Sequence, residues 1–336
     1  MSNAPIEPAP ARLRTLMCGY MVTQCLAVVA RLGIADELAA GAASVEDLAK
    51  RTDVDPDALF RVLRALAGLG VFEETSPRVF AQTELSAPLQ ENARPSMRHL
   101  ALLFGGDMYQ VWGSMFDSVK SGSPSFAKVF GHEHFAYLSK NPASLATFTK
   151  AMAGTARGRV DALMEVDWAG TTSVVDVGGG DGTLLLELLA KQPALSGTVF
   201  DLPELQASAG QKIASAGLDA RCSFRGGSFL GDDPPAADAY VLARVLHNWS
   251  DAHARAILAR IRSAAKPGAR IVIIDDVLAE GGGFETGKLL DLQMLVVLGG
   301  RERTAAEWRS LLSGSGFEVT SLRRDPRFGL VEGRAV

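Results

Sequence analysis

The sequence lacks the features that mark secreted, metal-binding or membrane-spanning proteins. Its three cysteines, Cys18, Cys25 and Cys222, are an odd number without paired spacing, so they indicate neither a disulfide framework nor a zinc site. No run of about 18 consecutive apolar residues occurs, and residues 1–12 lack the basic start and apolar middle of a signal peptide. We therefore expect a cytoplasmic protein with no bound metal and no membrane segment.

An excess of charge of one sign is also missing. The 34 lysine and arginine residues are nearly balanced by 38 aspartate and glutamate residues, which leaves a formal net charge of −4. Such a balance produces no global field that would attract nucleic acid or an anionic membrane surface. A small molecule is therefore the expected partner. With 336 residues, 47% of them hydrophobic, the chain is long enough for two compact units.

The amino-terminal half of the chain predicts mainly helices. Residues 1–12 are rich in proline and predict a disordered tail, whereas residues 13–40 carry apolar side chains at helical spacing, with a break near Gly33. Residues 96–168 are again helical in pattern and contain many phenylalanine, tyrosine, tryptophan and methionine side chains. Such side chains form either a core or the lining of a pocket.

Between these helical regions, residues 43–83 predict two helices, the second beginning at Pro56, followed by a short hairpin. This order is a winged-helix pattern, a fold often found in DNA-binding proteins. DNA binding requires several cations on the second helix, and that helix offers only Arg61 and Arg64 among apolar residues. A packing module that pairs two subunits is the favoured interpretation.

From residue 169 onward the pattern changes to short apolar runs that alternate with helices. Alternation of this kind predicts a parallel sheet covered by helices on both faces, with the late segment FEVTSLRR as one more strand. In such doubly wound folds, ligands bind at the carboxyl ends of the strands, where the strand order reverses. The functional residues are therefore expected directly after strands.

A glycine-rich turn follows the first of these strands, from Asp176 to Gly182. A dinucleotide-binding fingerprint would place a glycine at position 183, where this chain has Thr183, so the spacing is Gly-x-Gly-x-Gly instead. Nicotinamide cofactors carry a diphosphate, whereas S-adenosylmethionine carries an ammonium and a sulfonium that favour a nearby carboxylate such as Asp176. Asp201, at the end of the next strand, is placed to accept the ribose hydroxyls of an adenosyl group.

His247 is the one histidine of five that follows a predicted sheet strand, in the segment VLHNWSD. A phenol, with a pKa of about 10, needs a base before it can attack a methyl group, and histidine is the side chain best suited to that task. Asp275 and Glu302 are candidate acids that would orient the imidazole, although His247 could also be a capping or core residue. The pair His132 and His134 lacks a third metal ligand, so an exposed loop is favoured there.

Four motifs together resemble the O-methyltransferase family typified by plant caffeate and animal acetylserotonin enzymes, with bacterial polyketide-tailoring members. They are VVDVGGGDG, FDLPEL, RVLHNWSD and LDLQMLVVLGGRERTAAEW, in the family's order and over nearly the whole chain. The resemblance implies an α/β fold: a class I methyltransferase, Rossmann-like doubly wound sheet with an amino-terminal α-helical, winged-helix-like dimerisation domain. It also implies S-adenosylmethionine as cofactor, a small aromatic hydroxyl acceptor and a homodimer.

The resemblance also assigns roles to individual residues. It places His247 at the family's general base and Asp275 and Glu302 at its two supporting acids, although glutamate is usual where Asp275 stands. The cofactor-binding set that it implies, together with the acid of the glycine turn, is Asp176, Gly178, Gly180, Asp201, Leu202, Gly227, Ser228, Phe229 and Arg244. Ser228 departs from the family, because an aspartate customarily accepts a hydrogen bond from adenine there. The implied acceptor-binding set is Phe148, Met152, Asp291 and Met294, for which ordinary helix packing is the alternative.

The expected segments are a disordered tail (1–12), a winged-helix-like dimerisation domain (13–95), a helical layer lining the acceptor pocket (96–168) and a catalytic domain that binds S-adenosylmethionine (169–336). Three alternatives remain at this point. The same fold and cofactor could support decarboxylation or hydroxylation. A nicotinamide-dependent oxidoreductase shares the wound sheet, but Thr183 counts against it. A ligand-responsive regulator would have no use for His247 together with Glu302.

Overall fold

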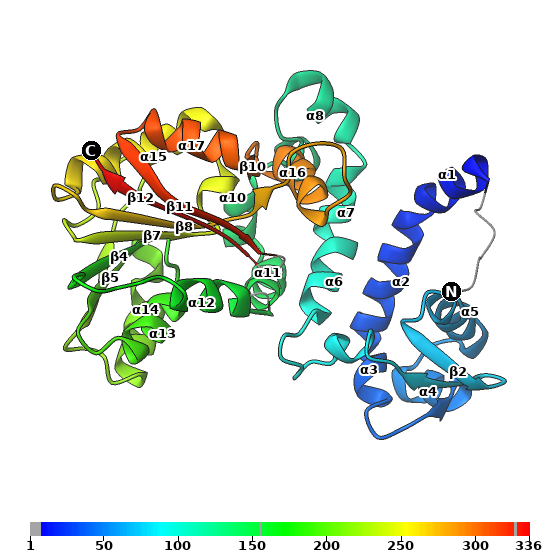
Figure 1. Ribbon diagram of the computed structural model, residues 1–336. Helices are drawn as coiled ribbons and strands as arrows, with labels where there is room; N and C mark the ends of the chain where they lie inside the picture. Colours follow the sequence, from blue (N-terminus) through cyan, green and yellow to red (C-terminus); the bar gives the residue numbers. More distant parts are fainter. Residues whose placement is uncertain (1–7, 155, 326–327) are drawn as a thin grey trace, which may run out of the picture. The chain divides into compact units, whose positions relative to one another are not determined.

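The computed structural model describes residues 8–154, 156–325 and 328–336, which form two compact units (Figure 1). The first unit contains residues 8–113 and 135–154, and the second contains residues 114–134 with the described residues from 156 onward. The helical residues between 96 and 168 are therefore divided between the two units. Most of the predicted tail, residues 1–7, lies outside the described residues.

The first unit begins with helices that break near the predicted position. α1 (Ala9–Met17) starts four residues before the predicted helical stretch, because Pro10 lies in its first turn, where a missing N–H breaks no hydrogen bond. α2 (Gly19–Leu32) ends at Gly33, which adopts the left-handed conformation with φ of 68°, and α3 (Ile34–Glu37) follows.

The next elements have the predicted winged-helix order. The Ser44 hydroxyl accepts from the Asp47 amide to cap α4 (Val45–Thr52), and the Asp55 carboxylate caps α5 (Pro56–Ala67) in the same way. β2 (Phe72–Ser76) and β3 (Val79–Gln82) form the hairpin, and β1 (Ala43–Ser44) pairs with β3 to give the order β1-β3-β2. The buried side chains at the centre of this module include Leu48, Leu63, Leu66, Phe72 and Phe80.

The first two helices expose a series of large apolar side chains, although they belong to a folded unit. These are Leu13, Leu16, Met17, Tyr20, Met21 and Val28. By length and mean hydropathy, Ala9–Leu32 also passes the test for a membrane-spanning helix, a test that core helices of globular proteins pass as well. The first unit is completed by η1 (Ala87–Leu89), α6 (Arg98–Gly105), α7 (Asp107–Trp112), most of α10 (His134–Lys140) and α11 (Pro142–Gly154).

The second unit contains a seven-stranded sheet with the order β11-β12-β8-β7-β4-β5-β6. Its strands are β4 (Ser173–Val177), β5 (Ser196–Asp201), β6 (Cys222–Gly226), β7 (Ala239–Ala243), β8 (Arg270–Ile274), β11 (Phe317–Asp325) and β12 (Phe328–Ala335). β4 to β8 are parallel, as predicted. The FEVTSLRR segment lies in β11, which is antiparallel to β12 because the two strands form a hairpin, and a short connection permits only antiparallel pairing. The sheet is therefore mixed.

Helices cover both faces of this sheet. α15 (Asp251–Ala264) and α17 (Ala305–Ser313) pack on one face, around buried residues such as Tyr240, Ile271 and Trp308. α12 (Ala156–Met164), α13 (Thr183–Lys191) and α14 (Gln206–Ser215) pack on the other, around Val174, Val199 and Val241. The remaining described helices of the unit are α8 (Met115–Ser121), α9 (Phe126–Phe130), α16 (Thr286–Val297), η2 (Pro203–Leu205) and η3 (Leu246–Asn248). The strand order reverses at β4, which fixes where a ligand site is expected.

Candidate active site

The glycine turn after β4 lies directly against a buried carboxylate. Asp176 is 2% exposed, and its Oδ2 has no hydrogen-bond partner within the described part of the chain. A Cβ on Gly179 would lie only 2.5 Å from that oxygen, and one on Gly178, which has φ of 72°, would lie 2.8 Å from Val245. Glycine is therefore required at both positions. Burial, and then the charge of Asp201, raise the pKa of Asp176 to about 7.

Asp201, at the end of β5, is tied to the same turn. Its Oδ2 accepts from the Gly180 amide at 2.7 Å, and its Oδ1 accepts from the Leu202 amide at 2.7 Å. Burial raises the pKa of Asp201, although these two amides act in the opposite direction. The structure thus brings together the residues predicted at the first two strand ends.

The end of β6 adds an aromatic ring beside the turn. The Phe229 ring lies next to Gly178 and packs edge-on against Trp249 at a centroid distance of 6.0 Å. Gly227 donates to the Asp201 carbonyl at 2.9 Å. The Ser228 amide donates to Asp232 Oδ2 at 2.9 Å, a contact that sequence reasoning missed.

His247 lies in η3, which follows β7 in the chain. The residue is 4% exposed. Its Nδ1 is 2.7 Å from Oε1 of Glu302, whose side chain is fully buried. Burial acts to raise the pKa of Glu302, but His247, Arg244 and Arg303 together outweigh it, so that the pKa is lowered. Glu302 is therefore an ionised partner for the imidazole.

Asp275, the other predicted partner of His247, contacts the backbone of that residue instead of its ring. Asp275 Oδ2 accepts from the His247 amide at 3.3 Å, so the shorter aspartate side chain holds the turn and not the imidazole. Burial raises the pKa of Asp275, against the effects of His247 and Arg244. The two predicted acids thus have different positions, and Glu302 is the one on the ring.

Two arginines place positive charge among these acids. Arg244 adopts the left-handed conformation, with φ of 58°, and its Nη1 lies 2.9 Å from Asp276 Oδ2 and 3.6 Å from Glu302 Oε1. Arg159 of α12 has its pKa lowered by burial and by Arg244, while Asp176 and Asp275 act to raise it. Arg159 lies outside every motif, in an ordinary helical stretch, so no pattern in the sequence pointed to it.

The predicted acceptor residues belong to different units. Asp291 and Met294 lie on α16 in the second unit, where Asp291 Oδ1 accepts from the Glu302 amide at 2.8 Å and Met294 is buried. Phe148 and Met152 lie on α11 in the first unit, where Phe148 packs edge-on against Phe135 at 6.3 Å. Asp291 thus touches the acid that binds the imidazole, which was not foreseen.

His134 lies in a different environment from the predicted exposed loop. It is 2% exposed and packs edge-on against Phe126 at 4.9 Å, and burial lowers its pKa to about 4. No group of three or more His, Cys, Asp or Glu side chains in the described ranges is arranged to hold a metal ion.

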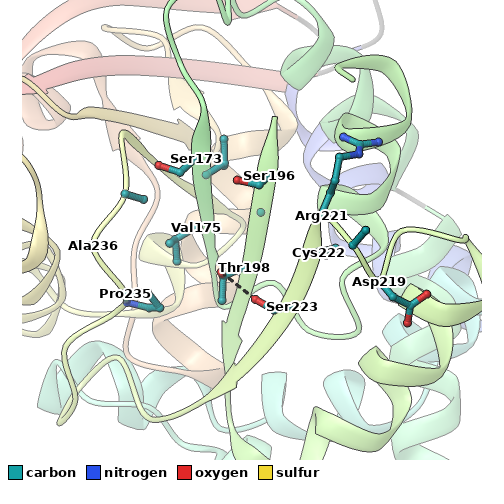
Figure 2. A pocket seen from close by; sticks show the side chains of 14 residues that line it. Ser173, Val175, Ser196, Thr198, Asp219, Arg221, Cys222, Ser223, Pro235 and Ala236 are labelled. Atoms are coloured by element: carbon teal, nitrogen blue, oxygen red, sulfur yellow. Dashed lines mark hydrogen bonds between the residues drawn. The ribbon is translucent and has the colours of Figure 1, made fainter. Parts of the chain in front are cut away.

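A groove of about 270 Å³ lies at the amino-terminal ends of β4, β5 and β6, opposite the strand ends that carry His247 (Figure 2). Its polar groups are largely bonded to the protein itself: Thr198 to Ser223 and Ser173 to Asp238. The Arg221 guanidinium donates to backbone carbonyls at and after the end of α13. Within the described residues, the buried polar atoms without a hydrogen-bond partner include Asp176 Oδ2 at the glycine turn but no atom that lines this groove.

Comparison with known proteins identifies a family to which these features belong. Residues 112–318 match the family model of an O-methyltransferase domain, and residues 15–91 match that of an O-methyltransferase dimerisation domain. The phenazine O-methyltransferase of Lysobacter antibioticus is 39% identical over 319 residues, which cover 95% of this chain and 94% of the relative.

The chain belongs to the O-methyltransferase family. A second relative of this O-methyltransferase, the 3-amino-4-hydroxybenzoate 4-O-methyltransferase of Streptomyces cremeus, is 36% identical, with 96% of this chain and 89% of the relative covered. The crystal structure of human N-acetylserotonin methyltransferase in complex with S-adenosylmethionine superposes with a TM-score of 0.87, at 29% identity and 99% coverage of both chains. The predicted family and fold class are confirmed. The enzyme is an S-adenosylmethionine-dependent O-methyltransferase of secondary metabolites.

The residues around the glycine turn fit this cofactor. The unsatisfied Oδ2 of Asp176 is a ready partner for a positively charged ligand, and the glycines leave room for a close approach to the backbone. Asp201 has one bond on each carboxylate oxygen and keeps further lone pairs for hydroxyl donors.

Proposed function

We propose that this O-methyltransferase methylates a phenolic hydroxyl of a small aromatic metabolite, with His247 as the general base. The observation that carries the proposal is the 2.7 Å contact between His247 Nδ1 and a fully buried Glu302, beside the glycine turn. Val245, two residues before His247, packs directly on Gly178, so the base and the cofactor turn are close neighbours. The acceptor class is supported by the relatives, whose names describe a phenazine and a hydroxybenzoate substrate.

Glu302 determines which imidazole nitrogen is available to the acceptor. An ionised carboxylate at Nδ1 accepts the Nδ1–H bond, and this tautomer leaves the Nε2 lone pair free to take a proton. When Nε2 receives the phenolic proton, the imidazolium is stabilised by Glu302. Bound S-adenosylmethionine supplies an electrophilic methyl group on a sulfonium. The enzyme contributes mainly orientation, an effect worth up to about 11 kcal/mol for a well-aligned pair.

The cofactor contacts follow from the same geometry. Asp176 would offset the positive charge of the methionyl end, and Asp201 would accept from the ribose hydroxyls. The adenine would lie at Leu202, Gly227, Ser228 and Phe229. Arg244, which is paired with Asp276, would act mainly as a counter-charge for the acids around the base.

The proposal also covers the residues that bind the acceptor and the pairing of two copies of the chain. Phe148, Met152, Asp291 and Met294 would contact the acceptor, and the exposed apolar face of α1 and α2 would pair with a second copy in a homodimer in the cytoplasm. Decarboxylation or hydroxylation on the same fold is the alternative, and it differs in the mass change of the product.

A mass-spectrometric screen tests this function. Purified enzyme, S-adenosylmethionine and a panel of phenols, flavonoids and quinones should give products heavier by about 14 Da. His247→Ala should lose this activity while calorimetry shows unchanged cofactor binding. His253→Ala is the matched control, because His253 is an exposed imidazole on α15, and it should keep full activity. A mass loss of about 44 Da would identify a decarboxylase, and an active His247→Ala would remove the proposed base.

A further inference from the structure

Among the described residues of the second unit, Arg303 is the most deeply buried cation, at 1% exposure. No motif in the sequence assigned a role to it. Its Nε and Nη2 donate to Asp251 Oδ1 at 3.0 and 2.9 Å. Its Nη1 donates to the carbonyls of Leu246 and Arg301 at 3.1 and 3.3 Å, and Nη2 also donates to the Trp249 carbonyl at 3.1 Å. Every nitrogen of the guanidinium is therefore engaged.

Two of these carbonyls lie on either side of the proposed base. Leu246 directly precedes His247, and Trp249 follows it by two residues, so the guanidinium holds η3 from both ends. The backbone of Arg303 directly follows Glu302, the acid on the imidazole. A single residue thus links the turn that carries the base to the segment that carries its partner, which directly precedes β10.

The backbone before Arg303 strengthens the same link. The Arg301 amide donates to the His247 carbonyl at 2.9 Å. A Cβ at Gly300 would lie 2.1 Å from that carbonyl oxygen, so the chain passes as closely as glycine allows. The spacing between η3 and the segment 300–303 is consequently fixed by packing as well as by hydrogen bonds.

Arg303 is itself held on its other sides. Its guanidinium lies over the Trp308 ring at 5.1 Å, and Trp308 Nε1 donates to the Asp276 carbonyl at 3.2 Å. β10 (Arg303–Thr304) pairs in parallel with β9 (Val277–Leu278), which directly follows Asp275 and Asp276, the two residues after β8. Arg303 therefore connects the segments that follow β7 and β8, both of which carry charged residues of the site.

The chemistry of this position requires arginine. A buried guanidinium is costly unless its donors are satisfied, and here the planar fork reaches one carboxylate and three carbonyls at once. Lysine would keep the charge, but its ammonium is a point charge with three donors and lacks the fork. A lysine at this position would therefore preserve the electrostatics better than the geometry.

We propose that Arg303 is a positioning residue that sets the distance and orientation between His247 and Glu302. The inference rests on the proposed role of His247 as base. Arg303 does not touch the reacting atoms; it acts through η3. The charged groups that surround the pair, besides Arg303, are Arg244, Asp275, Asp276 and Asp291.

The test is Arg303→Lys, measured by steady-state kinetics across pH and by calorimetry with S-adenosylmethionine. We expect kcat to fall by about 10- to 100-fold, as expected for a displacement of about 1 Å, with KM and cofactor affinity within about twofold. The acidic limb of the kcat profile should move to lower pH, because the imidazolium loses part of its counter-charge. A merely structural role would lower the Tm and leave the shape of the profile unchanged.

Arg309→Lys is the matched control. Arg309 lies on α17, six residues after Arg303, and its side chain is exposed, outside the base turn. This variant should keep the wild-type kcat and pH profile. If Arg303→Lys does not fold, Asp251→Asn, which loosens Arg303 from its carboxylate, should shift the profile in the same direction by a smaller amount.

The outcomes separate the two proposals. A wild-type kcat and pH profile in folded Arg303→Lys, with His247→Ala inactive, overturns the positioning role and leaves the proposed function standing. An active His247→Ala overturns both. A lowered kcat with a shifted profile in Arg303→Lys, and neither change in Arg309→Lys, supports the inference.

Discussion

The glycine turn and the base turn both contain buried carboxylates, yet the pKa of Asp176 at the glycine turn and the pKa of Glu302, the acid on the imidazole, are shifted in opposite directions. Burial and the neighbouring acid Asp201 raise the pKa of Asp176, whereas His247, Arg244 and Arg303 outweigh burial at Glu302 and lower its pKa. The positive charges around Glu302 thus outweigh burial, although Glu302 Oε2 and Asp275 Oδ1 have no hydrogen-bond partner within the described residues. At Asp176 the charge of Arg159 does not outweigh burial, so a cationic cofactor would add the counter-charge that this acid needs.

Removal of the charge at the base turn should have the largest effect. Glu302→Gln keeps a hydrogen-bonding group of similar size but cannot stabilise an imidazolium. We expect kcat to fall by about 10²- to 10⁴-fold, the usual range for loss of acid–base catalysis. Steady-state assays at several pH values would measure this loss. Wild-type activity in Glu302→Gln would mean that the buried ion pair has no catalytic role.

Removal of the charge at the glycine turn should affect binding instead of turnover. Asp176→Asn should weaken S-adenosylmethionine binding by at least about tenfold in calorimetry, because the amide cannot offset a positive charge. Glu187→Gln, a change of the same kind in an exposed residue of α13, is the control. Equal cofactor affinities in all three proteins would contradict the comparison between the two turns.

Asp176→Asn should also have a higher free energy of unfolding than the wild type when no ligand is bound. The Asp176 carboxyl titrates near 3.8 when unfolded and near 7 when folded, so the folded state retains a proton that the unfolded state loses. Stability therefore falls as pH rises from about 4 to 7 and stays low above that. At pH 8, Asp176→Asn should gain on the order of a few kcal/mol in unfolding free energy, measured by urea denaturation. No gain, or a loss, would contradict the raised pKa.

Cofactor affinity of the wild type should follow the same ionisation. Between pH 8 and pH 6 the ionised fraction of a group with a pKa of about 7 falls roughly tenfold, so the Kd for S-adenosylmethionine should rise by about tenfold. Calorimetry across pH would measure the change, and Asp176→Asn should flatten it. A Kd in the wild type that is independent of pH would exclude Asp176 as the cofactor's counter-charge.

The smallest effect is expected at the end of β6. Ser228→Asp restores the acid that is customary in the family, but Asp232 already lies against the Ser228 amide and would repel it. The two effects oppose each other, so cofactor affinity should change by less than about fivefold. The double variant Ser228→Asp, Asp232→Asn removes the repulsion and should bind more tightly than either parent, as measured by calorimetry.

The local features of the site could be predicted from the sequence. The glycine turn follows from the spacing of Gly178 and Gly180 after an apolar strand, and the candidate base follows from the position of His247 after another. Both depend on neighbouring residues in the chain, so a single stretch of sequence contains the signal. The winged-helix order and the parallel part of the sheet were predictable for the same reason.

The contacts between distant segments could not be predicted. Asp275 holds the backbone of His247 and not its ring, because an aspartate side chain is one carbon shorter than the usual glutamate. Arg303 reaches carbonyls more than 50 residues away, and Arg159 acts on acids of two different strands. The antiparallel β11 depends on its hairpin with β12, which strand propensity alone does not reveal.

The pH dependence of single-turnover methyl transfer, with S-adenosylmethionine bound in advance, tests the role of the base most directly. At pH 7 a phenol with a pKa of about 10 needs the imidazole, so His247→Ala should be slower than the wild type by about 10²-fold or more. As pH rises the phenol ionises without help, and the two rates should converge near pH 10. Rates that stay parallel over the whole range would show that the imidazole does not remove the proton.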